Sequence, residues 1–433
     1  MFRFGKGTRG GRRGFFARLF EALTRGGRRR AGARAWQPSE VRLVSIEPPT
    51  VRVAPAARTL QRRRMATIRR ALRPRTWFVT AGYVEWLEDR TLLSTLYWEG
   101  DVDANWSTVG NWSSDGMGTP AVAGPANGDT LVFDTGTTGL TSFTSNADTS
   151  LTGITIQIVD NDAANDFTIQ SGAGVSVGLS AMGGISHTQT AATAGTTISI
   201  ETLSLVGDTS ITNTNGTLNI SSNVTNAGNL LTLDGAGTTT LSGVISGAGG
   251  LTKSGTGPLT LSGANTYTGT TTLTGGSLNI QGSISGPLAV NATGNIQLTN
   301  AGGNTQIADG TVTATFAPGD PTDVTVNGGA GNDTLTVNDP AVLPTGGLIF
   351  AAGAGSDAMV LNGPVAVTTV THSFVNDTDG SVDIDGKMIS YTGLAPITDN
   401  LSATDRVFSF TGGSETITLS DDTGMVAGMS MID

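Results

Sequence analysis

The sequence contains no cysteine, only two histidines, and few charged or aromatic side chains. The lack of cysteine excludes disulfide bonds, thiolate nucleophiles and cysteine-ligated zinc. Charged residues make up 14% of the 433 residues, whereas an ordinary globular domain has about 25%. No apolar run reaches the roughly 18 residues of a transmembrane helix. These deficits argue against thiol-dependent enzymes and against a protein that crosses a membrane with helices.

The few charges are divided sharply along the chain. Of the 25 Lys and Arg, 22 lie within residues 1–90 beside six acidic residues, for a formal charge of +16. Residues 91–433 hold three cations and 29 acidic residues, a charge of −26. We therefore predict a basic arm over 1–95, disordered or short-helical, that serves in sorting or export. Basic segments also bind nucleic acid, but no nucleic-acid-binding motif accompanies this arm, so no such partner is expected.

Glycine is abundant, with 61 residues, and much of it recurs at a fixed interval. Aligning the segment that begins at Thr232 with the one that begins at Thr252 superposes four glycines, and also Leu241 on Leu261, all twenty residues apart. Between the glycines, Leu259 and Leu261 alternate with Thr, which is the period of a half-buried strand. Such a repeat predicts a solenoid, whose coils stack because none buries its own apolar face. An antiparallel sandwich with short strands is the alternative.

The segment Gly250–Ile280, GLTKSGTGPLTLSGANTYTGTTTLTGGSLNI, closely resembles the autotransporter-associated β-strand repeat of bacterial surface and secreted passenger proteins. The best copy spans 249–280, and fainter copies extend over roughly 200–290. The resemblance implies an all-β fold, a right-handed parallel β-helix or solenoid exposed outside the cell. We accordingly expect a β-helix over 96–320 and further β-strands over 321–433.

Residues 87–94, LEDRTLLS, resemble the LEPR-xLL motif that follows an Arg-rich leader in large exported bacterial proteins. The matching residues are Leu87, Glu88, Arg90, Leu92 and Leu93, while Asp89 replaces the proline. The resemblance implies export, and a solvated linker is the alternative.

Three tryptophans, Trp98, Trp106 and Trp112, cluster where the acidic body begins. The open end of a β-helix exposes core side chains and unpaired strand edges, so a bulky aromatic cap is expected there. The competing interpretation is a surface on which sugars stack. No acidic or amide cluster at a fixed offset accompanies the tryptophans, which favours the cap.

The segment Val324–Asp339 contains GGAGNDTLT, which resembles the hemolysin-type calcium-binding nonapeptide. A degenerate copy, AAGAGSDAM, follows twenty-four residues later. In that family, turn carbonyls and aspartates of successive coils hold Ca²⁺. The resemblance implies a weak calcium site at Gly329, Gly331, Asp333 and Asp357, provided that the two aspartates lie on consecutive coils. A tight turn whose aspartate caps backbone amides is the alternative.

No catalytic constellation is evident in the sequence. His187 and His372 stand alone, and beyond residue 90 the only cations are Lys253, Lys387 and Arg406. Polysaccharide-cleaving β-helices need a cationic base or several converging carboxylates. We therefore expect a non-catalytic, exported β-solenoid, extracellular or at the cell surface, that serves as a surface, matrix or adhesion module. Its expected partners are cell-envelope or extracellular matrix components, including glycans. A polysaccharide-binding or polysaccharide-cleaving β-helix is the alternative.

Overall fold

The computed structural model describes residues 93–135, 144–161, 166–181, 183–189 and 195–410, together with two short strands, β34 (Leu419–Asp421) and β35 (Ser430–Ile432). The basic arm expected at 1–95 and most of the LEDRTLLS segment lie outside these residues. The chain divides into two units, Met1–Leu87 and Glu88–Asp433, and only the second is treated below. Within the described ranges, no helix is long and apolar enough to cross a membrane.

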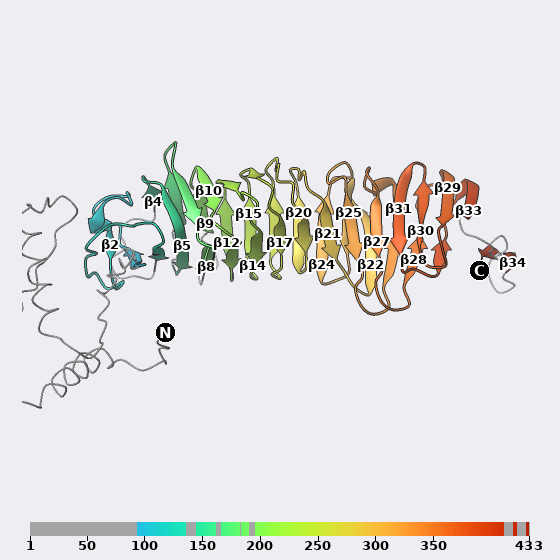
Figure 1. Cartoon of the computed structure of the whole chain (residues 1–433), viewed down its shortest axis with the longest axis horizontal. Helices are drawn as coiled ribbons and strands as arrows, with labels where there is room; N and C mark the ends of the chain where they lie inside the picture. Colours follow the sequence, from blue (N-terminus) through green and yellow to red (C-terminus); the bar gives the residue numbers. More distant parts are fainter. Residues whose placement is uncertain are drawn as a thin grey trace, which may run out of the picture. The chain divides into compact units, whose positions relative to one another are not determined.

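The second unit is a solenoid of mostly parallel strands, in which the chain winds through three faces and each strand pairs with its counterpart one coil later (Figure 1). The predicted fold class, an all-β parallel solenoid, is confirmed. We call the three stacks of strands face A, face B and face C.

Face A is the longest stack. In stacking order it comprises β1 (Thr95–Trp98), β3 (Thr130–Asp134), β5 (Leu151–Asp160), β8 (Ile185–Gln189), β11 (Thr209–Asn213), β14 (Leu231–Asp234), β17 (Leu251–Lys253), β19 (Thr271–Leu273), β21 (Leu288–Asn291), β25 (Val324–Asn327), β27 (Leu348–Ala351), β31 (Lys387–Thr392), β30 (Gly380–Ile384), β29 (Val367–Phe374) and β33 (Ala403–Phe410). Neighbours are parallel except in the meander β29–β31, whose strands pair antiparallel.

Face B is also a stack of mostly parallel strands. It comprises β4 (Thr144–Ala147), β6 (Phe167–Ser171), β9 (Gly195–Ser199), β12 (Thr217–Ile220), β15 (Thr238–Leu241), β18 (Pro258–Leu261), β20 (Gly276–Ile280), β24 (Val312–Phe316), β23 (Asn304–Ala308), β22 (Asn295–Ala301), β26 (Thr334–Val337), β28 (Ala358–Leu361) and β32 (Ile397–Asp399). The meander β22–β24 is antiparallel. Stacking continues across residue 320, because β21 pairs with β25 and β22 with β26.

Face C is short. It comprises β7 (Ser176–Leu179), β10 (Thr202–Leu205), β13 (Asn223–Thr225) and β16 (Ile245–Ser246), with the start of β5 beside β7. At the start of face A, β2 (Trp112–Ser113) pairs antiparallel with β1. Two short 3₁₀ turns, η2 (Val109–Asn111) and η3 (Pro340–Val342), lie outside the stacks.

The twenty-residue register predicted for the central coils is the register of strand pairing. Leu241 of β15 pairs with Leu261 of β18, and Thr240 pairs with Thr260. The expected one-residue slip follows, because Leu261 pairs with Ile280, nineteen residues on. Both leucines are buried, while both threonines are partly exposed, so leucine faces the core and threonine faces solvent.

Stacked glycines at the corners explain why the repeat is so rich in glycine. A Cβ on Gly255 would lie 2.1 Å from the carbonyl oxygen of Gly235, and a Cβ on Gly257 would lie 2.1 Å from that of Gly237. These contacts are with backbone of the preceding coil, which cannot swing aside as a flexible side chain does. A side chain at these corners would force the coils apart.

The first coil is closed by aromatic side chains. Trp98 and Trp112 lie edge to face with ring centroids 5.1 Å apart, and Trp106 contacts Trp112 at 6.3 Å. All three rings are at most 1% exposed and pack on Phe133. The predicted aromatic cap is confirmed. The competing sugar-stacking surface is wrong for these rings, because none of them is open to solvent.

The C-terminal coils are joined by a column of side-chain amides. Asn338 donates from Nδ2 to Oε1 of Gln297 (2.8 Å), and Asn362 donates to Oδ1 of Asn338 (3.4 Å). Asn400 donates in turn to Oδ1 of Asn362 (2.9 Å). We call these four residues the amide ladder. Each rung ties one coil to the coil before it, so the ladder fixes the register of the longer coils.

Candidate functional site

The two glycine-rich turns at 328–333 and 352–357 lie on consecutive coils, one above the other. The strands before them, β25 and β27, and the strands after them, β26 and β28, pair in register twenty-four residues apart. The structure therefore brings Asp333 and Asp357 to equivalent positions, which is the arrangement that the implied calcium site requires.

Backbone geometry accounts for the glycines of the first turn. Gly329 and Gly331 adopt φ of +93° and +121°, a region that residues with a Cβ rarely enter. The Ala354 amide donates to the Gly329 carbonyl (2.8 Å), and the Gly331 amide donates to the Ala354 carbonyl (2.8 Å). The carbonyls of Gly329 and Ala354 thus already accept backbone hydrogen bonds that hold the two coils together.

Both carboxylates are buried, with 1% exposure each, and each accepts one backbone amide. Oδ1 of Asp333 accepts from the Gly294 amide, and Oδ1 of Asp357 accepts from the Asp333 amide (2.7 Å). The Oδ2 atoms of both side chains are buried and have no hydrogen-bond donor among the described residues. A Cβ on Gly328 would lie 2.8 Å from Oδ2 of Asp333, so glycine there leaves room for the carboxylate.

The chemistry of this donor set fits a hard cation such as Ca²⁺, which binds oxygen ligands. Two buried carboxylate oxygens without a donor are costly unless something compensates them. Across the described ranges, no group of three or more His, Asp or Glu side chains gathers that could hold a metal ion. Asp333 and Asp357 would therefore need backbone carbonyls as further ligands to hold a calcium ion. The other expected residues, Gly329 and Gly331, would contribute by shaping the turn.

His187 lies inside the solenoid, where it ties neighbouring coils together. Its Nδ1 is 2.8 Å from Oδ1 of Asn213, and its Nε2 is 3.0 Å from Oγ1 of Thr196. Burial lowers the pKa of His187, although the Asn213 hydrogen bond and the charge of Asp160 oppose that shift. The ring is fully buried, so His187 has a structural role and no access to a substrate.

His372 is not isolated in space, although it stands alone in the sequence. Its Nε2 lies 3.1 Å from Oδ2 of Asp399, which also accepts from Nε of Arg406 (3.0 Å). Burial raises the pKa of Asp399, but the hydrogen bonds from His372 and Arg406 outweigh it and hold the value at about 2. The His372 ring stacks on Phe408 at 5.3 Å. This network fastens the last coil, and sequence spacing gave no indication of it.

Lys253 is a second residue whose position sequence reasoning missed. It is 3% exposed and stands in an interior column between Leu233 and Leu273. Its Nζ donates to the carbonyls of Gly255 and Gly275 (3.3 Å for the latter). Burial lowers the pKa of Lys253. The alternation from Leu251 to residue 253 could have revealed that this side chain points inward.

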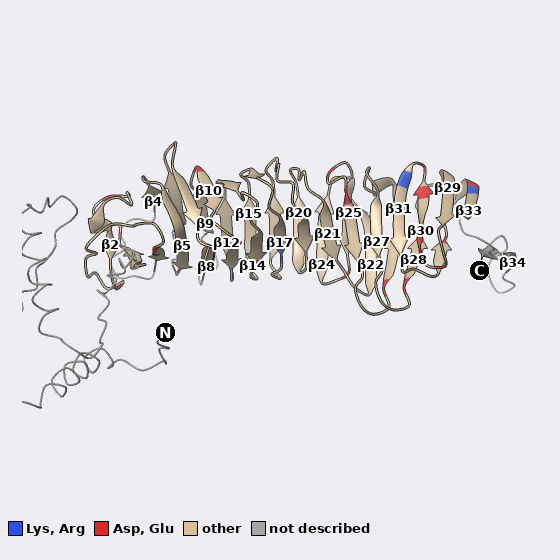
Figure 2. Cartoon of the chain, in the orientation of Figure 1, with Lys and Arg blue, Asp and Glu red and all other residues tan. Residues whose placement is uncertain are grey.

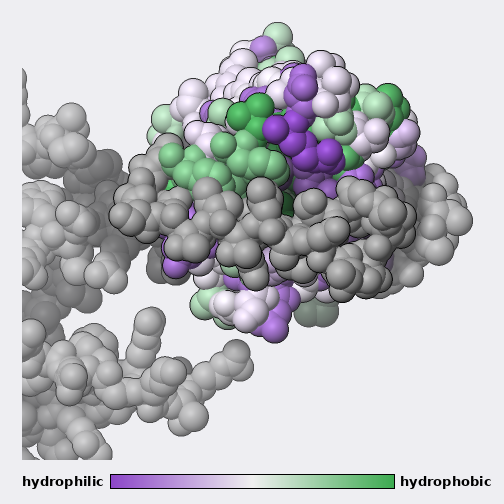
Figure 3. Space-filling model, turned by 90° about the vertical axis from the view of Figure 1, so that its right-hand side faces the viewer, coloured by the Kyte–Doolittle hydropathy of each residue, from purple (hydrophilic) through white to green (hydrophobic). Residues whose placement is uncertain are grey.

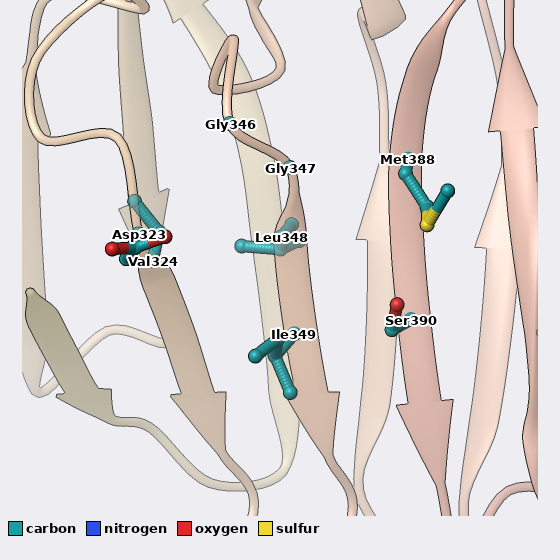
Figure 4. A pocket seen from close by; sticks show the side chains of 8 residues that line it. All are labelled: Asp323, Val324, Gly346, Gly347, Leu348, Ile349, Met388 and Ser390. Carbon is teal, nitrogen blue, oxygen red and sulfur yellow. The ribbon is translucent and has the colours of Figure 1, made fainter.

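The surface cavities are small. One of about 160 Å³ lies on face A, where Asp323, Ile349, Met388 and Ser390 surround the bare backbone of Gly346 and Gly347 (Figure 4). Another of about 200 Å³ includes Asp339, Asp385 and Lys387.

The charged groups of the second cavity already hold backbone atoms in place. Asp385 accepts hydrogen bonds from the backbone amides of Thr368 and Thr369, and Lys387 donates one to the Ala341 carbonyl. The first cavity is lined by Ser390 as well as Asp323, and neither of the two cavities is lined by a histidine.

Charge is distributed unevenly over the solenoid. Between residues 195 and 308 the sequence holds four charged residues, Glu201, Asp208, Asp234 and Lys253, whereas 309–410 holds fourteen. Figure 2 shows that the acidic residues of the C-terminal part lie mainly in loops and at strand ends. The central faces are therefore nearly uncharged and carry mostly hydroxyl and amide groups.

Comparison with known families gives a match in the central coils. Residues 251–280 match the model of the passenger-associated-transport-repeat family. No curated protein and no solved structure gives a match. The matched residues run from β17 through β20, in the middle of the parallel stack. The predicted resemblance to an autotransporter passenger repeat is thereby confirmed for this segment, while the LEPR-xLL and hemolysin-type resemblances stay predictions. The solenoid carries a passenger-type repeat at its centre.

Proposed function

We propose that the chain is an exported, non-catalytic β-solenoid that serves as a cell-surface, matrix or adhesion module. The observation that supports this most strongly is the place of the passenger-type repeat. It is built into a continuous stack of parallel strands that runs from β6 to β24 on face B and from β1 to β31 on face A, so the coils around the repeat share its parallel architecture.

The surface of the solenoid supports the same proposal. The central coils offer long, nearly uncharged faces of Thr, Ser and Asn. A rigid rod with polar faces suits contact with cell-envelope or matrix components and glycans. The basic arm and the LEDRTLLS segment would direct export.

Localisation tests the proposal. In the native host, the full chain should appear in the cell-surface or medium fraction and should be accessible to antibody on intact cells. A reporter fused to residues 1–95 should also leave the cytoplasm. Retention of the full chain in the cytoplasm would contradict the proposal. Binding on a glycan array, or depolymerisation of a polysaccharide by the full chain, would favour the alternative of a polysaccharide-directed β-helix.

We propose a weak calcium site at Asp333 and Asp357 as a second, separate property. It is supported by the two stacked carboxylates whose Oδ2 atoms are buried without a donor. Melting should be compared in millimolar Ca²⁺ and in chelator. A one-site ligand at 100 times its Kd adds about 2.7 kcal/mol, so a site of this kind should give a measurable shift.

The control for the calcium proposal is an acid on the same coil. Asp333→Ala should abolish the difference between the melts in Ca²⁺ and in chelator. Asp323→Ala, which removes an exposed carboxylate, should leave that difference intact. Superimposable wild-type melts in Ca²⁺ and in chelator would make Asp333 and Asp357 turn-capping residues only.

A further inference from the structure

The two ends of the solenoid are finished differently. Tryptophans close the first coil, whereas the last coil ends in β33, which pairs along its length with β29 on one edge. On the other edge of β33 no strand of the described part of the chain is paired. Three apolar side chains of β33 are exposed: Val407 (46%), Phe408 (40%) and Phe410 (36%). Figure 3 views this end and shows hydrophobic surface beside strongly hydrophilic surface.

The hydrogen-bond phase of β33 identifies which residues form its free edge. The Val367 amide donates to the Ser402 carbonyl (2.8 Å), which sets the phase of the parallel ladder between β29 and β33. In that phase, the even-numbered residues of β33 direct their amides and carbonyls toward β29. The amides and carbonyls of Asp405, Val407 and Ser409 therefore point away from the solenoid and are open to another strand.

We propose that this edge pairs with the same edge of a second copy of the chain, antiparallel about a two-fold axis that passes through Val407. Head-to-tail stacking is blocked, because the tryptophan cap occupies the opposite end. Pairing of the open edge with itself is the remaining way for two copies to join strand to strand. Such an interface is closed by its own symmetry, so it gives a dimer and no filament.

The charges on β33 disfavour one neighbouring register. With Val407 opposite Val407 of the second copy, Asp405 faces Ser409 and the hydrogen-bonding residues of both edges meet each other. The neighbouring row then sets Arg406, whose guanidinium already bonds to Asp399 and to the Leu401 carbonyl, opposite the uncharged Phe408 of the second copy, so that no like charges meet. Centring the pair on Arg406 would instead set two like charges face to face, which is unfavourable.

The oligomeric state of the full chain tests the proposal. Sedimentation or light scattering should give a mass twice the 44.1 kDa of the chain. Val407→Pro removes one outward amide without touching the ladder to β29, and proline is tolerated on edge strands. This variant should be a folded monomer whose melting temperature does not depend on protein concentration, while Val407→Thr, which keeps the amide, should remain a dimer. A monomeric wild-type chain, or a dimeric Val407→Pro variant, overturns the proposal.

Cross-linking tests the register directly, and the absence of cysteine from the chain gives it a clean background. Hydrogen-bonded antiparallel neighbours lie about 5.5 Å apart at Cα, a separation that a disulfide bridges. Oxidised Val407→Cys should therefore cross-link nearly completely. Ser409→Cys should not, because the two positions 409 lie four residues apart in this register.

Two outcomes of the cross-linking experiment count against the proposal. Equal cross-linking at 407 and 409 would indicate random collision. A thiol at 407 that neither cross-links nor reacts with maleimide would indicate that residues 411–433 of the same chain cover the edge. Both results are independent of where the protein is localised, so the dimer and the proposed function fail separately.

Discussion

The central coils and the C-terminal coils of the solenoid keep their register by different combinations of the same contacts. In the central coils, glycine lies on glycine at the corners and leucine lies on leucine inside, at intervals of nineteen or twenty residues. In the C-terminal coils the interval is twenty-four residues or longer. Glycine still lies on glycine where Gly353 stacks on Gly329, and a longer set of side-chain hydrogen bonds is added. Asp357 accepts the Asp333 amide, and the amide ladder links Gln297 to Asn400. Both regions combine glycine contacts with side-chain hydrogen bonds, because Asn226 and Asn265 also join central coils. The regular coils differ in their fixed interval, and the longer coils in their continuous column of side-chain amides.

The largest effect should come from removing a leucine of the central columns. Leu261 is fully buried between Leu241 and Ile280. Leu261→Ala should cost about 2–5 kcal/mol in the free energy of unfolding, the range for a buried leucine. Leu261→Asp should cost more, because it buries an unpaired charge.

Denaturant unfolding measures both Leu261 substitutions. Thr260→Lys, one residue away on the solvent side, is the matched control and should change stability by less than about 0.5 kcal/mol. Equal losses at 260 and 261 would contradict the assignment of inside and outside.

A corner glycine should be nearly as sensitive. Gly255→Ala places a Cβ 2.1 Å from the carbonyl oxygen of Gly235, so we expect a loss of about 3 kcal/mol, the upper end for overpacking. Gly319→Ala is the control, since a Cβ there meets nothing within 4 Å. Thermal melting of the two variants gives the comparison. If both tolerate alanine, the close contact between coils is not what fixes the twenty-residue interval.

In the C-terminal coils, the loss of a single side-chain hydrogen bond should cost less stability than these changes. Asp357→Ala leaves the buried Asp333 amide without its side-chain acceptor, which should cost about 1–3 kcal/mol. Asp357→Asn keeps an acceptor oxygen and should restore most of that loss. Unfolding in the presence of chelator isolates this effect from any metal. If Asp357→Ala is as stable as Asp357→Asn, the hydrogen bond to the Asp333 amide does not stabilise the contact between the coils.

The last coil should respond to acid. Because the pKa of Asp399 is held at about 2 in the folded chain, below its ordinary value of 3.8, its stabilising effect is complete above pH 4. The effect is lost as the pH falls from about 4 to about 2. The expected loss is on the order of 1 kcal/mol after allowance for solvent screening. Asp399→Asn should flatten this part of the stability profile, and an unchanged profile would contradict the ion-pair network.

The smallest effect should come from one rung of the amide ladder. Asn362→Ala removes partly exposed hydrogen bonds to Asn338 and from Asn400. We expect a loss of about 0.5–1 kcal/mol, typical of a net hydrogen bond. Hydrogen exchange of the amides in β28 and β32 should quicken, while that of β15 and β18 should not. Uniform quickening would mean that the central coils depend on the ladder as well.

The same comparison explains how much of the fold the sequence could predict. Leu241 and Leu261 were predictable partners because their coils repeat at one interval and alternate inside with outside. The tryptophan cap was predictable because bulky aromatics cluster where a solenoid must begin. Both inferences use patterns that can be read within a short stretch of sequence.

The rest depends on pairings that no local pattern encodes. His372, Asp399 and Arg406 meet because the meander β29–β31 inserts two antiparallel turns between one coil and the next. The sequence could not predict that Asp333 aligns with Asp357. Their alignment depends on a coil of twenty-four residues, which differs from the twenty-residue interval of the repeat. The open edge of β33 depends on which strands pair with it, and a sequence pattern does not show that.

The amide ladder has an electrostatic consequence for the molecule. In all three of its bonds, the nitrogen points to the earlier coil and the oxygen to the later one. The dipoles of the four side-chain amides therefore add, and hydrogen bonds in such a chain polarise one another. The negative pole of the column falls at the oxygen of Asn400, beside the last coil. A solenoid whose sheets have almost no net dipole of their own thus acquires a direction along its axis, and a cation or a donor approaching the C-terminal end is favoured over an anion.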